Sequence, residues 1–179
     1  MLYAFGFERV GVFVSDLYFV NPRPAKGQEG AERGVRVELR VLERQPLRGS
    51  IYSAQPIAVD QPLWRVDLLE AVDSPPGSLD RAHHHPAFDG WEPGERHFVT
   101  ELSAAPVDWL AAQLSDLDGV LERARVAPGT AGPGDAASLR DTVPEILDVL
   151  RRLLARVAAG ELGRPDDDRE LISARIGWL

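Results

Sequence analysis

The chain has 179 residues, of which 44% are hydrophobic and 27% are charged, as is typical of a single folded domain with one core. Its formal charge of −8 has the wrong sign for stable binding to duplex DNA through phosphate contacts. The chain contains no cysteine, which excludes disulfides, iron–sulfur clusters, thiolate metal sites and cysteine nucleophiles. Any metal site must therefore use His, Asp and Glu.

No segment of the sequence approaches the roughly 18 consecutive apolar residues of a transmembrane helix. Residues 1–11 include Glu8 and Arg9 and lack the pattern of a signal peptide. We therefore expect a cytoplasmic protein without membrane association.

Residues 1–103 are predicted to be mainly β, because β-branched and aromatic residues alternate with polar ones between Gly-, Pro- and Asp-rich breaks. The first two apolar runs, 2–14 and 17–20, flank Ser15 and Asp16. This arrangement predicts a hairpin that turns at Ser15-Asp16.

Further strands follow a Pro- and Gly-rich loop at 21–34. Residues 35–41 alternate between apolar and charged side chains and give the clearest half-buried strand. Two extended stretches, 49–59 and 63–72, are separated by Asp60-Gln61-Pro62. The last predicted strand covers 97–102.

From Pro106 the apolar period changes from two to about 3.6 residues, which predicts an amphipathic helix. A second apolar stripe ends before Gly160, and the capping-box pattern Thr142-Val143-Pro144-Glu145 places the start of this helix near Val143. Residues 104–160 are thus mainly α, and 161–179 form a tail that docks on the core. The predicted fold is α+β: one domain over 1–179, with an antiparallel helix pair packed on an antiparallel sheet.

All four histidines lie between positions 83 and 97. Alternate residues of an extended segment point the same way, so His83 and His85 can present two imidazoles to one metal ion or one phosphate, while His84 faces elsewhere. The alternative is a solvated loop that ends at Pro86 and binds nothing.

A metal site needs ligands besides these imidazoles. The nearest side chains of the right kind are Asp80, Asp89, Glu92 and His97. Histidines and carboxylates with an open position are typical of hydrolytic zinc or non-haem iron sites, although the chain has no HExxH motif. The predicted cofactor is a divalent metal, zinc in the first place, and its candidate ligands are His83, His85, His97 and Asp89.

The strand 63–72 carries a second set of candidate residues. Arg65 and Asp67 share one face of this strand, opposite Trp64, Val66 and Leu68. An Arg there would stabilise an anion such as a phosphate, and an Asp would orient an imidazole. The alternative is a surface ion pair of little consequence, which is the preferred interpretation for Arg36, Glu38 and Arg40.

Several features follow one another over residues 35–123. A charged alternating strand is followed by a strand that opens with Tyr52-Ser53, a strand with Arg65 and Asp67, a His-rich turn, a short aromatic strand and an amphipathic helix. This order resembles the small TumE-type proteins of bacterial toxin–antitoxin systems, in which a His-x-His follows the Asp. In this chain only His83 and His85 match the His-x-His spacing. The acidic stretch 70–80 makes the interval between Asp67 and these histidines longer than in the family pattern.

The resemblance implies a toxin-like protein that acts on RNA and is neutralised by a partner protein. With a net charge of −8, binding to RNA requires basic residues to gather locally. The arginines expected to do so are Arg36, Arg65 and Arg81.

Three functional hypotheses remain open. The first is metal-assisted or His-mediated hydrolysis of a phosphoester, with His83 and His85 as ligands or acid–base pair, Asp67 as orienting carboxylate and Arg65 as anion clamp. The second is a non-catalytic module whose acidic surface, including 166–168, binds a basic protein. The third is a structural homodimer joined through an apolar seam at 178–179.

Overall fold

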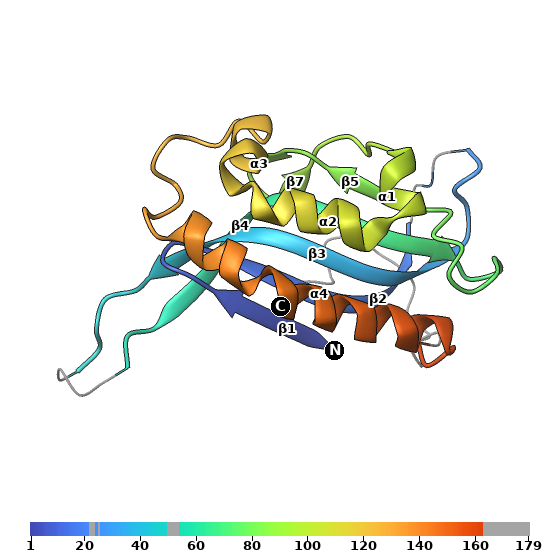
Figure 1. Cartoon of the computed structure of the whole chain (residues 1–179), viewed down its shortest axis with the longest axis horizontal. Coiled ribbons are helices and arrows are strands. Elements are labelled where there is room, and N and C mark those ends of the chain that lie inside the picture. The colour runs from blue at the N-terminus through green and yellow to red at the C-terminus, as the bar shows by residue number, and fades with distance from the viewer. Residues whose placement is uncertain (22–23, 25, 50–53, 163–179) are drawn as a thin grey trace.

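The computed structural model describes residues 1–21, 24, 26–49 and 54–162. Its centre is a five-stranded antiparallel sheet in which the strands follow their order in the chain (Figure 1). These strands are β1 (Leu2–Gly6), β2 (Val10–Val20), β3 (Ala31–Arg44), β4 (Ile57–Ala71) and β5 (His83–His85).

The other elements follow β5 in the chain. A short hairpin consists of β6 (Phe88–Asp89) and β7 (Glu92–Pro93). The helices are α1 (Thr100–Ala104), α2 (Pro106–Ser115), α3 (Leu117–Arg123) and α4 (Asp135–Ala158). A β-rich first half and a helical second half confirm the α+β prediction.

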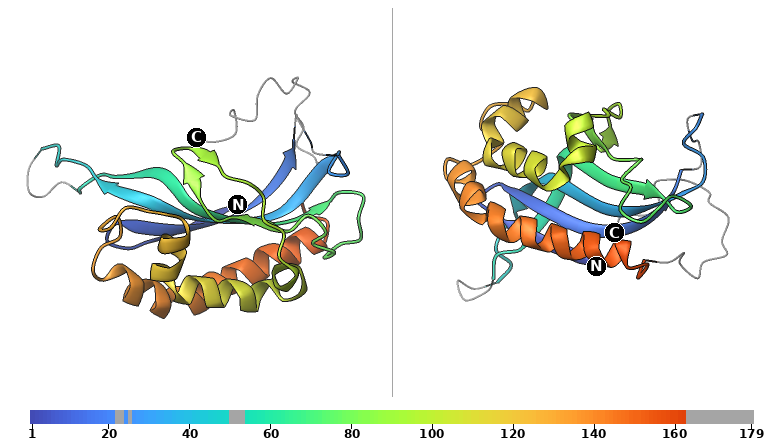
Figure 2. Two further views of the ribbon diagram at one scale, coloured as in Figure 1. Left: turned by 90° about the horizontal axis from the view of Figure 1, so that it is seen from above. Right: turned by 45° about the vertical axis from the view of Figure 1, so that its right-hand side comes forward.

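One face of the sheet packs against the helices. α2 and α4 run in opposite directions across it (Figure 1), while the hairpin β6–β7 rises on the other side of the sheet (Figure 2, left). Burial of this apolar face and of the helices' inner sides in one cluster supplies the main driving force for folding. The sheet residues of this cluster include Val12, Val14, Val35, Val37, Leu39, Trp64, Val66 and Leu68.

The first predicted turn is wrong, because Ser15 and Asp16 lie inside β2. The chain turns at 7–9 instead, where the Asp135 carboxylate accepts hydrogen bonds from the backbone N–H groups of Glu8 and Arg9. Asp16 is accommodated within the strand because it pairs with the N-terminal ammonium and, at 3.2 Å, with Arg156.

The break predicted at Asp60-Gln61-Pro62 is also absent, since β4 is continuous from Ile57 to Ala71. The register between β3 and β4 shifts at Arg40, next to Pro62. A bulge of this kind lets a strand accommodate a proline, which has no N–H to donate to the ladder. Arg40 secures the irregularity by donating from Nε to the Asp60 carbonyl oxygen at 3.0 Å.

The strand predicted at 97–102 is reduced to a single bridge between His97 and His84. β5 has only three residues, so the pairing ends there, and the chain turns into α1. Leu102 thereby becomes fully buried beneath the sheet.

Both predicted helices have different bounds in the structure. The first is divided at Asp116, whose side chain accepts a hydrogen bond from the Gly119 N–H and caps α3. The second starts at Asp135 and includes Pro144, so the predicted start near Val143 is wrong. Pro144 is exposed, where water can satisfy the carbonyl that its missing N–H leaves unpaired. The helix ends at Ala158, before Gly160 with φ 74°, as predicted.

No helix in the described ranges has the length and apolar character needed to cross a bilayer. Most of the predicted docking tail, 163–179, lies outside the described residues, as do Tyr52 and Ser53. The acidic run 166–168 and the apolar seam at 178–179 belong to this part of the tail.

Candidate metal and anion site

The face of the sheet that points away from the helices is charged and nevertheless buried. Arg36 is 6% exposed, Glu38 3% and Asp67 2%. β3 and β4 pair so that Arg36 lies opposite Asp67 and Glu38 lies opposite Arg65. The charged alternation of these strands therefore forms an internal ionic layer, and its interpretation as surface ion pairs is wrong.

Strand β5 adds two histidines to this layer. In the β4–β5 register His83 lies opposite Asp67 and His85 lies opposite Arg65. Because alternate residues of a strand point the same way, both imidazoles join the charged face. The prediction that His83 and His85 face the same way is confirmed. Both side chains are buried, so they do not lie in a solvated loop.

Asp67, His83 and His85 form a compact cluster. Their potential ligand atoms all lie within 4.8 Å of one another. Among the described residues, this is the cluster of His, Asp and Glu side chains that could hold a metal ion. Asp67 Oδ2 lies 3.4 Å from Nε2 of His83 and 3.7 Å from Nε2 of His85. Zinc bonds of about 2.1 Å in a tetrahedral arrangement place ligand atoms about 3.4 Å apart, so the spacing fits a metal ion.

The backbone fixes the orientation of the two rings and the role of their Nδ1 atoms. Nδ1 of His83 lies 2.8 Å from the Arg81 carbonyl oxygen, and Nδ1 of His85 lies 2.7 Å from that of Gly94. A carbonyl oxygen can only accept a hydrogen bond, so Nδ1 is the donor in both rings. Nε2 is then left to face Asp67, as in metal sites whose histidines donate their other N–H to a carbonyl.

This arrangement calls for a cation. Within the described structure, Nε2 of His83 is buried and has no hydrogen-bond partner. Asp67 Oδ2 already accepts a hydrogen bond from Arg36 Nη2 at 3.1 Å and lies 3.4 Å from this nitrogen. A cation here, whether a proton or a metal ion, would be stabilised by the carboxylate, and a metal ion would give His83 Nε2 the partner that it lacks.

Arg36 controls the charge of Asp67. Its Nε and Nη2 donate to the two carboxylate oxygens at 2.5 and 3.1 Å. Burial alone would raise the pKa of Asp67, but the charge of Arg36, its hydrogen bonds and the nearby His83 outweigh burial and hold that pKa well below its ordinary range. Asp67 is therefore ionised at neutral pH.

Burial has the opposite consequence for His85. It disfavours the imidazolium more than the Asp67 charge favours it, and the pKa of His85 falls to about 4. The ring is neutral at neutral pH, and its Nε2 lone pair is available to a metal ion or a proton.

A hollow of about 570 Å³ opens above the cluster, within the usual range of small-ligand pockets of about 300–1,000 Å³. Asp67 and His85 line it, whereas His83 lies beneath them and is 0% exposed. Its cationic lining is formed by Arg36, Arg40, Arg65 and Arg96.

The charge of this region differs from that of the whole chain. The four lining arginines pair with Glu32, Glu38 and Asp67 beneath them, and Glu92 is the further acidic residue of the lining. The region is thus near neutral in a chain of net charge −8. A divalent ion on Asp67 and the histidines would make it positive and attractive to an anion.

The remaining predicted ligands lie elsewhere. The His97 ring packs against His84 at 5.5 Å between centroids, and His84 also packs against Trp109 of α2, so both lie away from the cluster. Asp89 is exposed in β6. Asp80 accepts a hydrogen bond from the Ala71 N–H at the end of β4, at 3.0 Å, and others from serines in the turn that follows.

The predicted arginines gather only in part. Arg36 and Arg65 line the hollow, while Arg81 donates to the Gly27 carbonyl at 2.7 Å. Arg40 and Arg96 take its place, and the sequence interpretation missed both. Arg40 lies four residues after Arg36 in β3, so period-two alternation places both side chains on the same face. Arg96 follows a turn whose path the sequence does not show.

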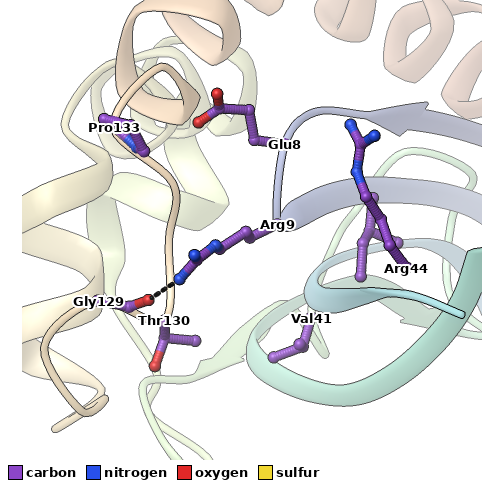
Figure 3. A pocket seen from close by; sticks show the side chains of 8 residues that line it. Glu8, Arg9, Val41, Arg44, Gly129, Thr130 and Pro133 are labelled. Atoms are coloured by element: carbon purple, nitrogen blue, oxygen red, sulfur yellow. Dashed lines mark hydrogen bonds between the residues drawn. The ribbon is translucent and has the colours of Figure 1, made fainter. Parts of the chain in front are cut away.

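A second hollow of about 640 Å³ lies beside the turn between β1 and β2 (Figure 3). Arg9 and Arg44 line it together with Glu8, and Arg9 donates to the Gly129 carbonyl at 2.8 Å. Its lining contains no histidine. It offers two arginines and a single carboxylate, Glu8, without the imidazoles that accompany the carboxylate in the first hollow.

Comparison of the chain with models of protein families, with curated proteins and with solved structures finds no match. The chemistry of the site is therefore what points to a function.

Proposed function

We propose that the protein hydrolyses phosphate esters with a divalent metal ion held by Asp67, His83 and His85. The observation that carries this proposal is the convergence of three ligand atoms within 4.8 Å beside an arginine-lined hollow. Metal ions and guanidinium groups are the usual means of stabilising the charge that develops on phosphoryl oxygens.

The ion would supply Lewis acidity and a bound water of lowered pKa. The residues of the chain have separate tasks. Arg36 keeps Asp67 ionised, and the carbonyl oxygens of residues 81 and 94 orient the rings of His83 and His85. Arg65 lines the hollow and would contribute positive charge where an ester phosphate binds.

The first test is direct. The purified chain is titrated with Zn²⁺, Mn²⁺ and Mg²⁺ by calorimetry, and hydrolysis of bis(p-nitrophenyl) phosphate is followed at each metal loading. We expect one strongly bound ion per chain and metal-dependent hydrolysis. His85→Ala should lower kcat/KM by at least about 100-fold, the usual scale for loss of a group that takes part in the chemistry, and His83→Ala should abolish metal binding.

His97→Ala is the matched control, because His97 is exposed and lies outside the cluster. It should retain metal stoichiometry and hydrolysis. If the wild-type chain shows no hydrolysis with any of the three ions, or if His97→Ala loses as much activity as His85→Ala, the proposal is wrong.

A further inference from the structure

The hairpin β6–β7 places an aromatic side chain at the edge of the hollow. Its two strands pair Phe88 with Pro93 and Asp89 with Glu92, so that Gly90 and Trp91 form a two-residue turn. Gly90 has φ 58°, a conformation that glycine adopts without strain. Trp91 at this turn is 57% exposed although it is a large apolar residue, and it lines the hollow.

The ring of Trp91 is held in position by the charged layer. The Arg40 guanidinium lies over it at 5.1 Å from its centroid. Arg40 is itself fixed by hydrogen bonds to the Asp60 carbonyl and to Glu38, both of 3.0 Å. The ring therefore has one side supported by a cation and retains a large exposed surface, as in platforms that stack nucleobases.

The same hairpin is tied to the metal-binding cluster. The Arg65 guanidinium lies 5.0 Å from the centroid of the Phe88 ring. The carbonyl of Gly94, directly after β7, accepts the hydrogen bond from His85. The N–H of Gly94 donates to the Ala87 carbonyl at 3.0 Å and closes the base of the hairpin. One short element therefore orients a ligand of the cluster at its base and presents Trp91 at its tip.

We propose that the hollow binds a nucleotide unit, with its base stacked on Trp91 and its phosphate among the arginines beside His85. This inference rests on the proposed function and names its substrate class. The free nucleotide and the terminal unit of a single strand share this chemistry. Every nucleobase has a face that can stack, so we expect little preference for base identity.

The test compares ligands that differ only in the base. Binding of adenosine monophosphate and of ribose 5-phosphate to the full chain is measured by calorimetry, with and without one equivalent of Zn²⁺. The wild-type chain should bind the nucleotide more tightly. In Trp91→Ala the ratio of the two affinities should fall by about 5- to 150-fold, which corresponds to about 1–3 kcal/mol of base–aromatic stacking.

Two variants sharpen the comparison. Trp91→Phe retains a smaller aromatic ring and should preserve part of the ratio. Arg44→Ala removes a cation from the second hollow and should leave the ratio unchanged, because Arg44 does not line the first hollow. A single-stranded tetranucleotide that binds more tightly than the mononucleotide, with the same dependence on Trp91, would identify a strand end as the natural source.

The outcomes separate the two proposals. Equal affinities for the two ligands in the wild-type chain, or an unchanged ratio in Trp91→Ala, would overturn the nucleotide inference even if simple esters are hydrolysed. A base-dependent affinity without any ester hydrolysis would support nucleotide binding and contradict the proposed function.

Discussion

The two faces of the sheet are built by the same alternation of residues but bury opposite kinds of side chain. Towards the helices the strands present Val37, Val66 and Leu68, at most 1% exposed. On the other face the neighbouring positions carry Arg36 and Asp67, which are also buried. Apolar burial stabilises the fold directly. In a buried ion pair, the attraction between the charges does little more than offset the cost of removing them from water. The charged face is therefore the one that stability alone does not explain.

The largest expected effect comes from breaking the ionic layer at Asp67. Asp67→Ala leaves the buried Arg36 without its bidentate partner and should lower the free energy of unfolding by about 3–5 kcal/mol. Urea denaturation followed by circular dichroism measures this change. The variant should also lose the bound metal ion.

A paired replacement tests whether the layer serves function and not stability. Arg36→Met combined with Asp67→Leu removes both charges and should recover most of the stability lost in Asp67→Ala. Metal binding should remain absent. A double variant that is no more stable than the single one would show that the ionic layer is needed for folding itself.

Metal loading is expected to come next in size. An ion that binds only the folded chain should raise the free energy of unfolding by about 2.7 kcal/mol at a free concentration about 100 times its dissociation constant. Thermal unfolding with Zn²⁺ and then with excess chelator measures the effect. It should disappear in His83→Ala and persist in His97→Ala, and a stabilisation that His83→Ala retains would place the ion elsewhere.

The helix-facing side should respond differently. Val37→Ala removes two buried methyl groups from the core and should cost about 2 kcal/mol. Because Val37 points away from the charged layer, the metal affinity of the folded variant should remain within about twofold of the wild-type value. A large loss of metal affinity would mean that the two faces are coupled through the strand.

The sequence predicted the face assignments better than the ends of the elements. Period-two alternation places Arg65 and Asp67 opposite the apolar residues of the same strand, and His83 and His85 on one side of theirs, because side-chain direction in a strand is a local property. The turn after β1 could not be predicted in this way. It is held by Asp135, which is more than 120 residues away in the sequence, as the hydrogen bonds to Glu8 and Arg9 show.

The ligand set was predicted in part for the same reason. The two imidazoles come from one strand, but their third partner depends on which strand pairs with β5. The sequence interpretation gave Asp67 the role of orienting an imidazole and chose Asp89 and His97 as ligands by nearness in sequence. The β4–β5 register brings Asp67 into the cluster instead. Burial of the charged face was missed because the hairpin β6–β7 covers part of it, and that contact is not local.

The smallest expected effect comes from an ion pair that has the same chemistry but lies in water. Arg151 donates to Asp148 at 2.8 Å on α4, and their side chains are 55% and 72% exposed. Exposed pairs of this kind contribute about 0–1 kcal/mol, so Arg151→Ala should change the free energy of unfolding by less than about 0.5 kcal/mol and leave metal binding intact. Arg65→Ala, which removes a partner of the buried Glu38, should have a clearly larger effect in the same assay. If the two arginine variants were equally mild, burial would not be what distinguishes the charged layer from an ordinary surface. Only loss of metal binding in the variants of the cluster would then distinguish that layer from ordinary surface ion pairs.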